Sequence, residues 1–170
     1  VTLNPRAQST YQFGRWNHVR IEAIGNSIRT WINGIPVSHV IDAMTPEGFF
    51  ALQIHSISRP ADAGRRVAWR NLRIQTTDLT PAPSDGIFVR NMIPNHVSEF
   101  EQAEGWRLLW DGKTTAGWRS ARAAAFPASG WNITDGVLAV QGNGGGDIVT
   151  QEEFSAFELQ MEFLITEGAN

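Results

Sequence analysis

The sequence contains no cysteine, only one tyrosine and no apolar run long enough to cross a bilayer. The absence of cysteine excludes disulfides, thiolate zinc sites and cysteine nucleophiles, and it fits cytoplasm and periplasm equally well. An excess of positive charge is also lacking, because 14 Lys and Arg stand against 17 Asp and Glu. With a net charge of −3 and no run of like charge, the chain has no electrostatic footprint for nucleic acid.

What is present is typical of a globular protein. The chain has 170 residues, of which 42% are hydrophobic. Seven tryptophans accompany the single tyrosine. Tryptophan stacks well on sugar rings, but packing inside a β-sandwich is the better explanation for most of these tryptophans. We assign Trp110, Trp118 and Trp131 to core and edge packing.

Alternating apolar and polar residues near the start of the chain predict a three-stranded antiparallel meander. The three strands are expected over residues 16–24, 27–32 and 35–40. Gly25-Asn26 and Asn33-Gly34 lie between them, and both pairs suit two-residue hairpin turns.

Strand patterns continue along the chain, with one short helix among them. Further strands are predicted over 49–55, 67–75, 106–110, 131–134, 137–140, 147–150 and 157–165. The helix is expected over 98–104, because Ser98 can cap its start and Glu101 stands at capping-box spacing. The fold class is therefore all-β, most simply an antiparallel two-sheet β-sandwich.

Several motifs resemble one known family. "EGWRLLWDGKTTAGWR", "GWNITDGVLAV" and "GGGDIVTQEEFSAFELQMEFLITEGAN" resemble the opening half of the 3-keto-disaccharide hydrolase family. "GRWNHVRIEAIGNSIRTWINGIPV" and "GFFALQIHS…AGRRVAWRNLRI" resemble its closing half. The resemblance implies a jelly-roll sandwich of the concanavalin A-like lectin/glucanase type.

The two halves come in reversed order. Residues 1–77 resemble the closing half of one family domain, residues 78–103 have linker composition with a short helix, and residues 104–170 resemble the opening half of a second domain. We expect an excerpt of a larger tandem protein. Each half would expose an unfinished sheet, which the halves can complete as one permuted sandwich or which other copies can complete in a homo-oligomer.

Gln53 and His55 share the polar face of a predicted strand, and their spacing alone favours a solvated face over a ligand site. The resemblance assigns that face to an oxidised glycoside, since the family carries a Gln-x-His motif here. His55 and Glu162 are then the catalytic candidates, and Gln53, Arg70 and Asn170 the substrate-binding ones. The implied reaction cleaves a 3-keto-glycoside by elimination and hydration across C1 and C2.

Other readings stay open beside this one. Glu158, Gln160 and Glu162 share a strand face, so a paired-carboxylate glycosidase is a competitor, although the row fits a solvated surface better. A non-catalytic carbohydrate-binding module of the same fold and a structural spacer are the alternatives without chemistry.

No metal site or cofactor motif is evident, and the residues leave a divalent metal open. His18, His39 and His96 lack metal-pair spacing, and we expect each at the surface or in a turn. We expect a periplasmic or secreted protein on the resemblance alone.

Overall fold

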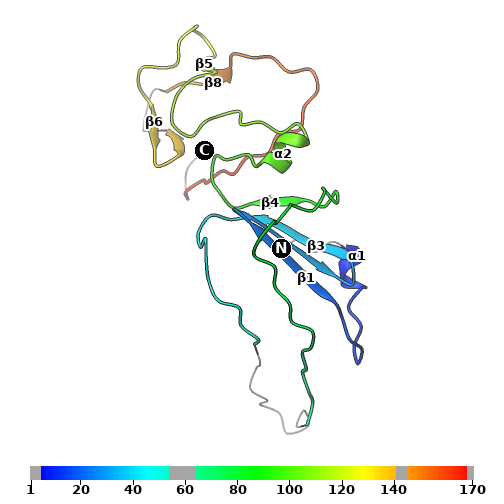
Figure 1. The fold of residues 1–170 in the computed structure, drawn as a ribbon. Helices are drawn as coiled ribbons and strands as arrows, with labels where there is room; N and C mark the ends of the chain where they lie inside the picture. Colours follow the sequence, from blue (N-terminus) through cyan, green and yellow to red (C-terminus); the bar gives the residue numbers. More distant parts are fainter. Residues whose placement is uncertain (1–4, 54–63, 141–144, 168–170) are drawn as a thin grey trace. The chain divides into compact units, whose positions relative to one another are not determined.

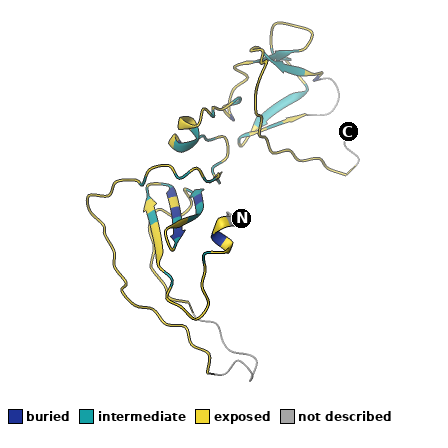
Figure 2. Cartoon of the chain, turned by 90° about the vertical axis from the view of Figure 1, so that its right-hand side faces the viewer, coloured by how far each residue is buried: buried dark blue, intermediate teal, exposed yellow. Residues whose placement is uncertain are grey.

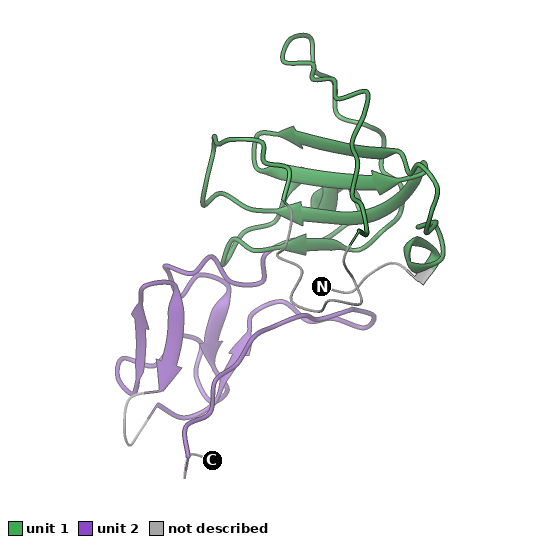
Figure 3. Ribbon diagram, turned by 90° about the horizontal axis from the view of Figure 1, so that it is seen from below, with its two compact units in different colours: residues 1–107 green, residues 108–170 purple. Residues whose placement is uncertain are grey.

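The computed structural model describes residues 5–53, 64–140 and 145–167. Eight strands and two short helices lie in these ranges, so the predicted all-β class is confirmed. The chain divides into two compact units, residues 1–107 and 108–170 (Figure 3). Each unit is described by itself.

The first unit is built on the predicted meander (Figure 1). It begins with the short helix α1 (Pro5–Gln8), which the sequence patterns did not predict, and continues with β1 (Val19–Ile24), β2 (Ser27–Ile32) and β3 (Ile35–Ile41). Neighbouring strands pair antiparallel in the order in which they follow one another. A register shift between Thr30 and Trp31 accommodates Pro36, which lacks a backbone N–H for the ladder.

Both predicted turns of the meander form. Asn33 and Gly34 have φ of 51° and 81°, the left-handed pair that a type I′ hairpin requires. Gly25 has φ of 60° at the first position of the other turn, where a type II′ hairpin favours glycine. The turns fix the register, so the residues that share a face of the sheet follow from the sequence.

The segment after residue 78 completes this sheet. β4 (Val89–Asn91) adds to β3 as a parallel strand, so the sheet order is β1-β2-β3-β4 and one ladder departs from the antiparallel prediction. Helix α2 (Glu99–Ala103) follows, and its capping box between Ser98 and Glu101 is present as predicted. Residues 78–103 therefore supply one strand and one helix to the first unit.

The second unit contains two small antiparallel sheets. β5 (Trp118–Ser120) pairs with β8 (Ile148–Thr150), and β6 (Trp131–Thr134) pairs with β7 (Val137–Val140). The predicted hairpin at Asp135-Gly136 is confirmed, with φ of 52° and 75°. Each tryptophan of β5 and β6 donates its indole N–H to a backbone carbonyl, Trp118 to Leu109 and Trp131 to Gly146.

Several predicted strands do not form. Residues 49–53, 67–75, 106–110 and 157–165 are described, and none of them is in a strand. Their apolar side chains are largely exposed, among them Phe49, Phe50, Leu52, Val67, Leu72, Ile74, Phe157, Met161 and Phe163. Alternating apolar and polar residues give a segment the two faces of a strand. The segment forms a strand only if a neighbouring strand also pairs with its backbone N–H and C=O groups.

Buried residues alternate with less buried ones along β2, and the buried residues of β2 and β3 share one face of the meander. Figure 2 marks the buried positions along these strands. Ile41 is fully buried, and Ser27, Arg29, Trp31 and His39 are buried around it. The opposite face carries side chains that stay exposed, including Val19, Ile21, Ile28 and Ile35. The covered face is thus the more polar of the two.

Candidate functional site

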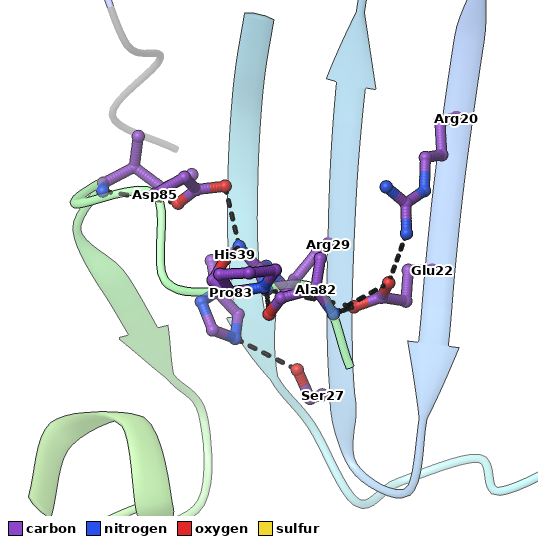
Figure 4. Close-up of polar contacts among 9 residues, drawn as sticks. Arg20, Glu22, Ser27, Arg29, His39, Ala82, Pro83 and Asp85 are labelled. Carbon is purple, nitrogen blue, oxygen red and sulfur yellow. Dashed lines mark hydrogen bonds and ion pairs between the residues drawn. The ribbon is translucent and has the colours of Figure 1, made fainter. Parts of the chain in front are cut away.

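The polar face of the meander brings three charged or titratable residues into one row. Glu22 of β1 lies opposite Arg29 of β2, and Arg29 lies opposite His39 of β3. Residues directly opposite in adjacent strands share a face, so the three side chains lie on the same side of the sheet. Figure 4 shows this row and the chain segment that crosses it.

Arg29 is the centre of the row. Its side chain is only 1% exposed, and its guanidinium donates to three oxygens of the crossing segment. The acceptors are the carbonyl oxygen of Ala82 at 2.5 Å, the carbonyl oxygen of Pro83 at 2.8 Å and Oδ2 of Asp85 at 2.8 Å. Its Nε is buried and has no hydrogen-bond partner among the described residues. Burying a guanidinium is tolerable only with such partners, because an unpaired buried charge costs several kcal/mol.

Glu22 holds the same segment from the other side. Its carboxylate accepts the backbone N–H of Ala82, at 3.1 Å to Oε1 and 3.2 Å to Oε2. The same carboxylate lies 3.9 Å from Arg29 and accepts from Arg20 at 2.6 Å. Both backbone polar groups of Ala82 are therefore hydrogen-bonded to this row, the N–H to Glu22 and the C=O to Arg29.

Aromatic rings flank the guanidinium groups. The Trp31 ring has the guanidinium carbon of Arg20 at 4.6 Å and that of Arg29 at 4.9 Å from its centroid. Phe100 of α2 lies 5.8 Å from the same atom of Arg29. Cation–π contacts of this kind strengthen as water is removed, which suits a guanidinium that is buried.

His39 closes the row beside Phe100. Its Nε2 lies 3.0 Å from Oγ of Ser27, and its side chain is buried. Burial lowers the pKa of His39 below 6.5 and the charge of Arg29 lowers it further, while Asp85, Glu101 and Glu22 act in the opposite direction. The expectation that His39 is a surface or turn residue is wrong, because helix α2 covers this end of the sheet.

The sequence patterns missed this row of Glu22, Arg29 and His39. The signal was present, since the two turns fix the register and place the three residues opposite one another. The sequence patterns do not show which segment covers the row, because that segment lies 53 to 56 residues beyond Arg29.

The predicted site residues have diverse placements. Gln53 and Arg70 belong to the first unit and are exposed, and Arg70 places its guanidinium carbon 4.0 Å from the ring centroid of Trp16. Glu162 is exposed in the second unit. Within the first unit, no described hydrogen bond or ion pair joins Gln53 and Arg70. His55 and Asn170 lie outside the described residues.

Within the described ranges, no group of three or more histidine, aspartate or glutamate residues could hold a metal ion. In the same part of the chain, neither helix has the length and apolarity needed to cross a membrane.

Comparison with known proteins decides the family. The profile of the 3-keto-alpha-glucoside-1,2-lyase-like domain matches residues 1–75 and 105–170, which is most of the chain. The chain belongs to this family. Its fold class is accordingly the all-β sandwich that the motifs predicted, and the resemblance stated from those motifs is confirmed.

A curated relative supports the same assignment. The 3-keto-disaccharide hydrolase of Bacteroides thetaiotaomicron is 37% identical over 76 residues. The match covers 40% of this chain and 26% of the relative, so the chain spans about a quarter of that protein's length.

Proposed function

We propose that this chain is part of a glycoside-processing protein that cleaves glycosides oxidised at C3 of the sugar. The observation that carries the proposal is the family match over residues 1–75 and 105–170. The name of the family, a 1,2-lyase-like domain for 3-keto-alpha-glucosides, and the name of the relative point to the same class of substrate.

The proposed reaction is an elimination followed by a hydration. The C3 ketone acidifies the hydrogen on C2, so a base removes that proton. The electron pair of the C2–H bond then forms the C1–C2 double bond while the C1–O bond breaks. An acid protonates the departing oxygen, and water adds its hydroxyl to C1 and a proton to C2. The sequence is redox-neutral and needs one acid–base group on each side of the bond.

Candidate residues for these roles come from the family resemblance. His55 is the proposed acid–base residue, because imidazole titrates near neutral pH, and Glu162 is the alternative base. Gln53 or Arg70 would stabilise the negative charge that develops on the ketone oxygen, and Asn170 would bind the substrate. In support, Gln53, Arg70 and Glu162 have exposed side chains that a ligand can reach.

The test is an assay of glycoside cleavage with 3-keto-trehalose or a 3-keto-glucoside. We expect His55→Ala and Glu162→Gln to lower turnover by about 10² to 10⁴, the range typical of a lost acid–base group. Glu158→Gln is the matched control, because Glu158 lies on the same exposed segment and accepts a hydrogen bond from Gln160. Turnover at the level of the unmodified protein in both site variants, with folding intact, would remove the assignment.

The second candidate is a carbohydrate-binding module without catalysis. It is favoured by exposed tryptophans, since Trp16 and Trp69 are 53% and 43% exposed. Binding of a 3-keto-glucoside without any cleavage would decide for this reading.

The domain organisation is part of the proposal. Residues 1–77 and 104–170 are proposed to be halves of two tandem family domains, and the match in two ranges supports this division. The apolar face of the meander, with Ile21 and Ile28 exposed, supports a partner sheet supplied by the rest of such a protein or by another copy. A periplasmic or secreted location belongs to the same proposal.

A further inference from the structure

The first unit buries the polar face of its meander, the face that would ordinarily be exposed to solvent. An antiparallel sheet with one covered face normally covers its apolar side. Here Arg29 and His39 are covered, at 1% and 4% exposure, whereas Ile21 and Ile28 of the opposite face are exposed. Burying polar groups costs free energy unless they are hydrogen-bonded. The groups that pair with Arg29 and Glu22 therefore indicate the chemistry of a ligand that could bind this face.

The partner is residues 82–85, which we call the strap. Ala82 and Asp85 are half-buried, and Pro83 and Ser84 are exposed. The strap is held by the hydrogen bonds of Arg29 and Glu22 rather than by deep apolar packing. A polar ligand that offers equivalent acceptors and donors can take the place of these hydrogen bonds, because the exchange leaves no buried polar group unpaired.

The backbone on either side of the strap differs in how it is anchored. Downstream, Gly86 has φ of 70°, and β4 then pairs with β3 through Val89–Asn91. Upstream, residues 76–81 are exposed and lie in no strand. The chain downstream of the strap is thus anchored by a strand, whereas the upstream end of the strap is held by the hydrogen bonds of Ala82 to Glu22 and Arg29. If a ligand replaces these bonds, Gly86 is positioned to absorb the change in backbone angles.

The chemistry of the strap matches that of an oxidised sugar. It offers Arg29 two carbonyl oxygens and a carboxylate oxygen, and it offers Glu22 one N–H donor. A 3-keto-glycoside offers a ketone oxygen of the same acceptor type, together with hydroxyl groups that both donate and accept. The Nε of Arg29, which no described residue accepts from, is one more donor that the strap leaves unused.

We propose that the polar face of β1–β3 binds the oxidised sugar ring, with Arg29 donating to the ketone and Glu22 accepting from a hydroxyl, and that the strap occupies this face until the sugar displaces it. The proposal rests on the proposed function, because the ligand class comes from there. It assigns to Arg29 and Glu22 a binding role that is additional to those of Gln53, Arg70 and Asn170.

The experiment is a two-dimensional NMR titration of the full chain with methyl 3-keto-α-glucoside, and with methyl α-glucoside as the non-oxidised control. We expect the keto sugar to shift the Ala82 amide signal and to speed its hydrogen exchange, because the N–H leaves Glu22. The control sugar should bind several-fold more weakly, since it lacks the ketone.

Two variants separate displacement from binding elsewhere. Asp85→Ala removes one of the strap's own anchors, so it should lower the dissociation constant of the keto sugar about 3- to 10-fold. Ser84→Ala, in the exposed part of the strap, should leave it unchanged. Equal affinity of Asp85→Ala and the unmodified protein would overturn the proposal.

The remaining outcomes distinguish the two proposals. Saturable binding that shifts the signals of Gln53 or Arg70 and leaves Ala82 unaffected would overturn displacement of the strap while the proposed function stands. An absence of binding to the unmodified protein and to Asp85→Ala alike would overturn both.

Discussion

His39 of β3 stands edge to face against Phe100 of α2, with the ring centroids 4.5 Å apart and the planes at 80°. This pair joins the helix after β4 to the face of the meander, and it places a titratable group in a buried position. Burial, followed by the charge of Arg29, lowers the pKa of His39.

The lowered pKa predicts a pH dependence of the first unit. An unfolded chain protonates histidine near 6.5, whereas folded His39 stays neutral to lower pH. The unfolded state therefore binds more protons between the two values, and stability falls as pH drops through 6.5 toward the folded pKa. Above 6.5 the contribution is complete. NMR titration of the His39 ring signals should give a midpoint below 6.5.

The control for this prediction is His39→Gln, which cannot titrate. Its denaturant midpoint should change less between pH 7.5 and pH 5 than that of the unmodified protein. A His39 midpoint at or above 6.5 would contradict the buried position of the ring.

The start of α2 offers a second prediction. Oγ of Ser98 receives the N–H of Glu101, and the Glu101 carboxylate accepts from the Ser98 N–H at 2.8 Å and from Asn91 at 2.8 Å. Ser98→Ala should destabilise the first unit by about 1 kcal/mol, the usual effect of losing such a cap. Ser98→Thr keeps a hydroxyl and should lose less. Equal denaturant midpoints for the alanine variant and the unmodified protein would show that the cap is not formed.

Asp111 provides a third prediction, in the second unit. Its carboxylate accepts from the hydroxyl of Thr114 at 2.6 Å and from the backbone N–H groups of Lys113 and Thr114. These bonds, the Thr114 hydroxyl first, lower the pKa of Asp111 from 3.8 to about 2. Its stabilising contribution is therefore present above 3.8 and is lost as pH falls toward 2.

Substitution of Thr114 tests the origin of this shift. In Thr114→Val the pKa of Asp111 should move back toward 3.8, and in Thr114→Ser, which keeps the hydroxyl, it should stay low. Carboxyl-carbon NMR over the acidic range measures both. An unchanged titration in the valine variant would assign the shift to the backbone bonds alone.

Gly145 carries the fourth prediction. A side-chain carbon at Gly145 would lie 2.7 Å from Nε1 of Trp131 and 2.9 Å from the carbonyl oxygen of Gly130. Gly145→Ala should therefore displace the Trp131 indole and weaken its hydrogen bond to Gly146, which lowers the thermal midpoint of the second unit. Gly48→Ala, in the first unit, is the control that should leave the midpoint of the second unit unchanged, because a carbon added there meets nothing within 4 Å. A second-unit midpoint that is equal in Gly145→Ala and the unmodified protein would contradict this packing.

The local elements of the fold were predictable because their signals lie within a few residues. Asn33-Gly34 and Asp135-Gly136 specify hairpins through their own backbone preferences, and Ser98 with Glu101 specifies a helix start. Residues 67–75 and 157–165 have equally clear alternation, yet they form no strand. Their pairing depends on segments elsewhere in the chain, and alternating hydrophobicity does not identify the strand with which a segment pairs.

The polar row was less predictable for a related reason. Glu22, Arg29 and His39 can be placed on one face from turns and register alone. Their burial depends on the strap, whose only visible signals were Pro83 and Asp85 in linker composition. Gln53, Arg70 and Glu162 remain predictions that rest on the family.

The most direct test of the proposed chemistry is the fate of the hydrogen on C2. Cleavage of 3-keto-trehalose in deuterium oxide should give a 3-keto-glucose that carries deuterium at C2, in excess of what the free keto sugar acquires under the same conditions. Elimination removes the original hydrogen and hydration returns one from solvent. A product that retains its original C2 hydrogen would show direct hydrolysis and contradict the elimination mechanism.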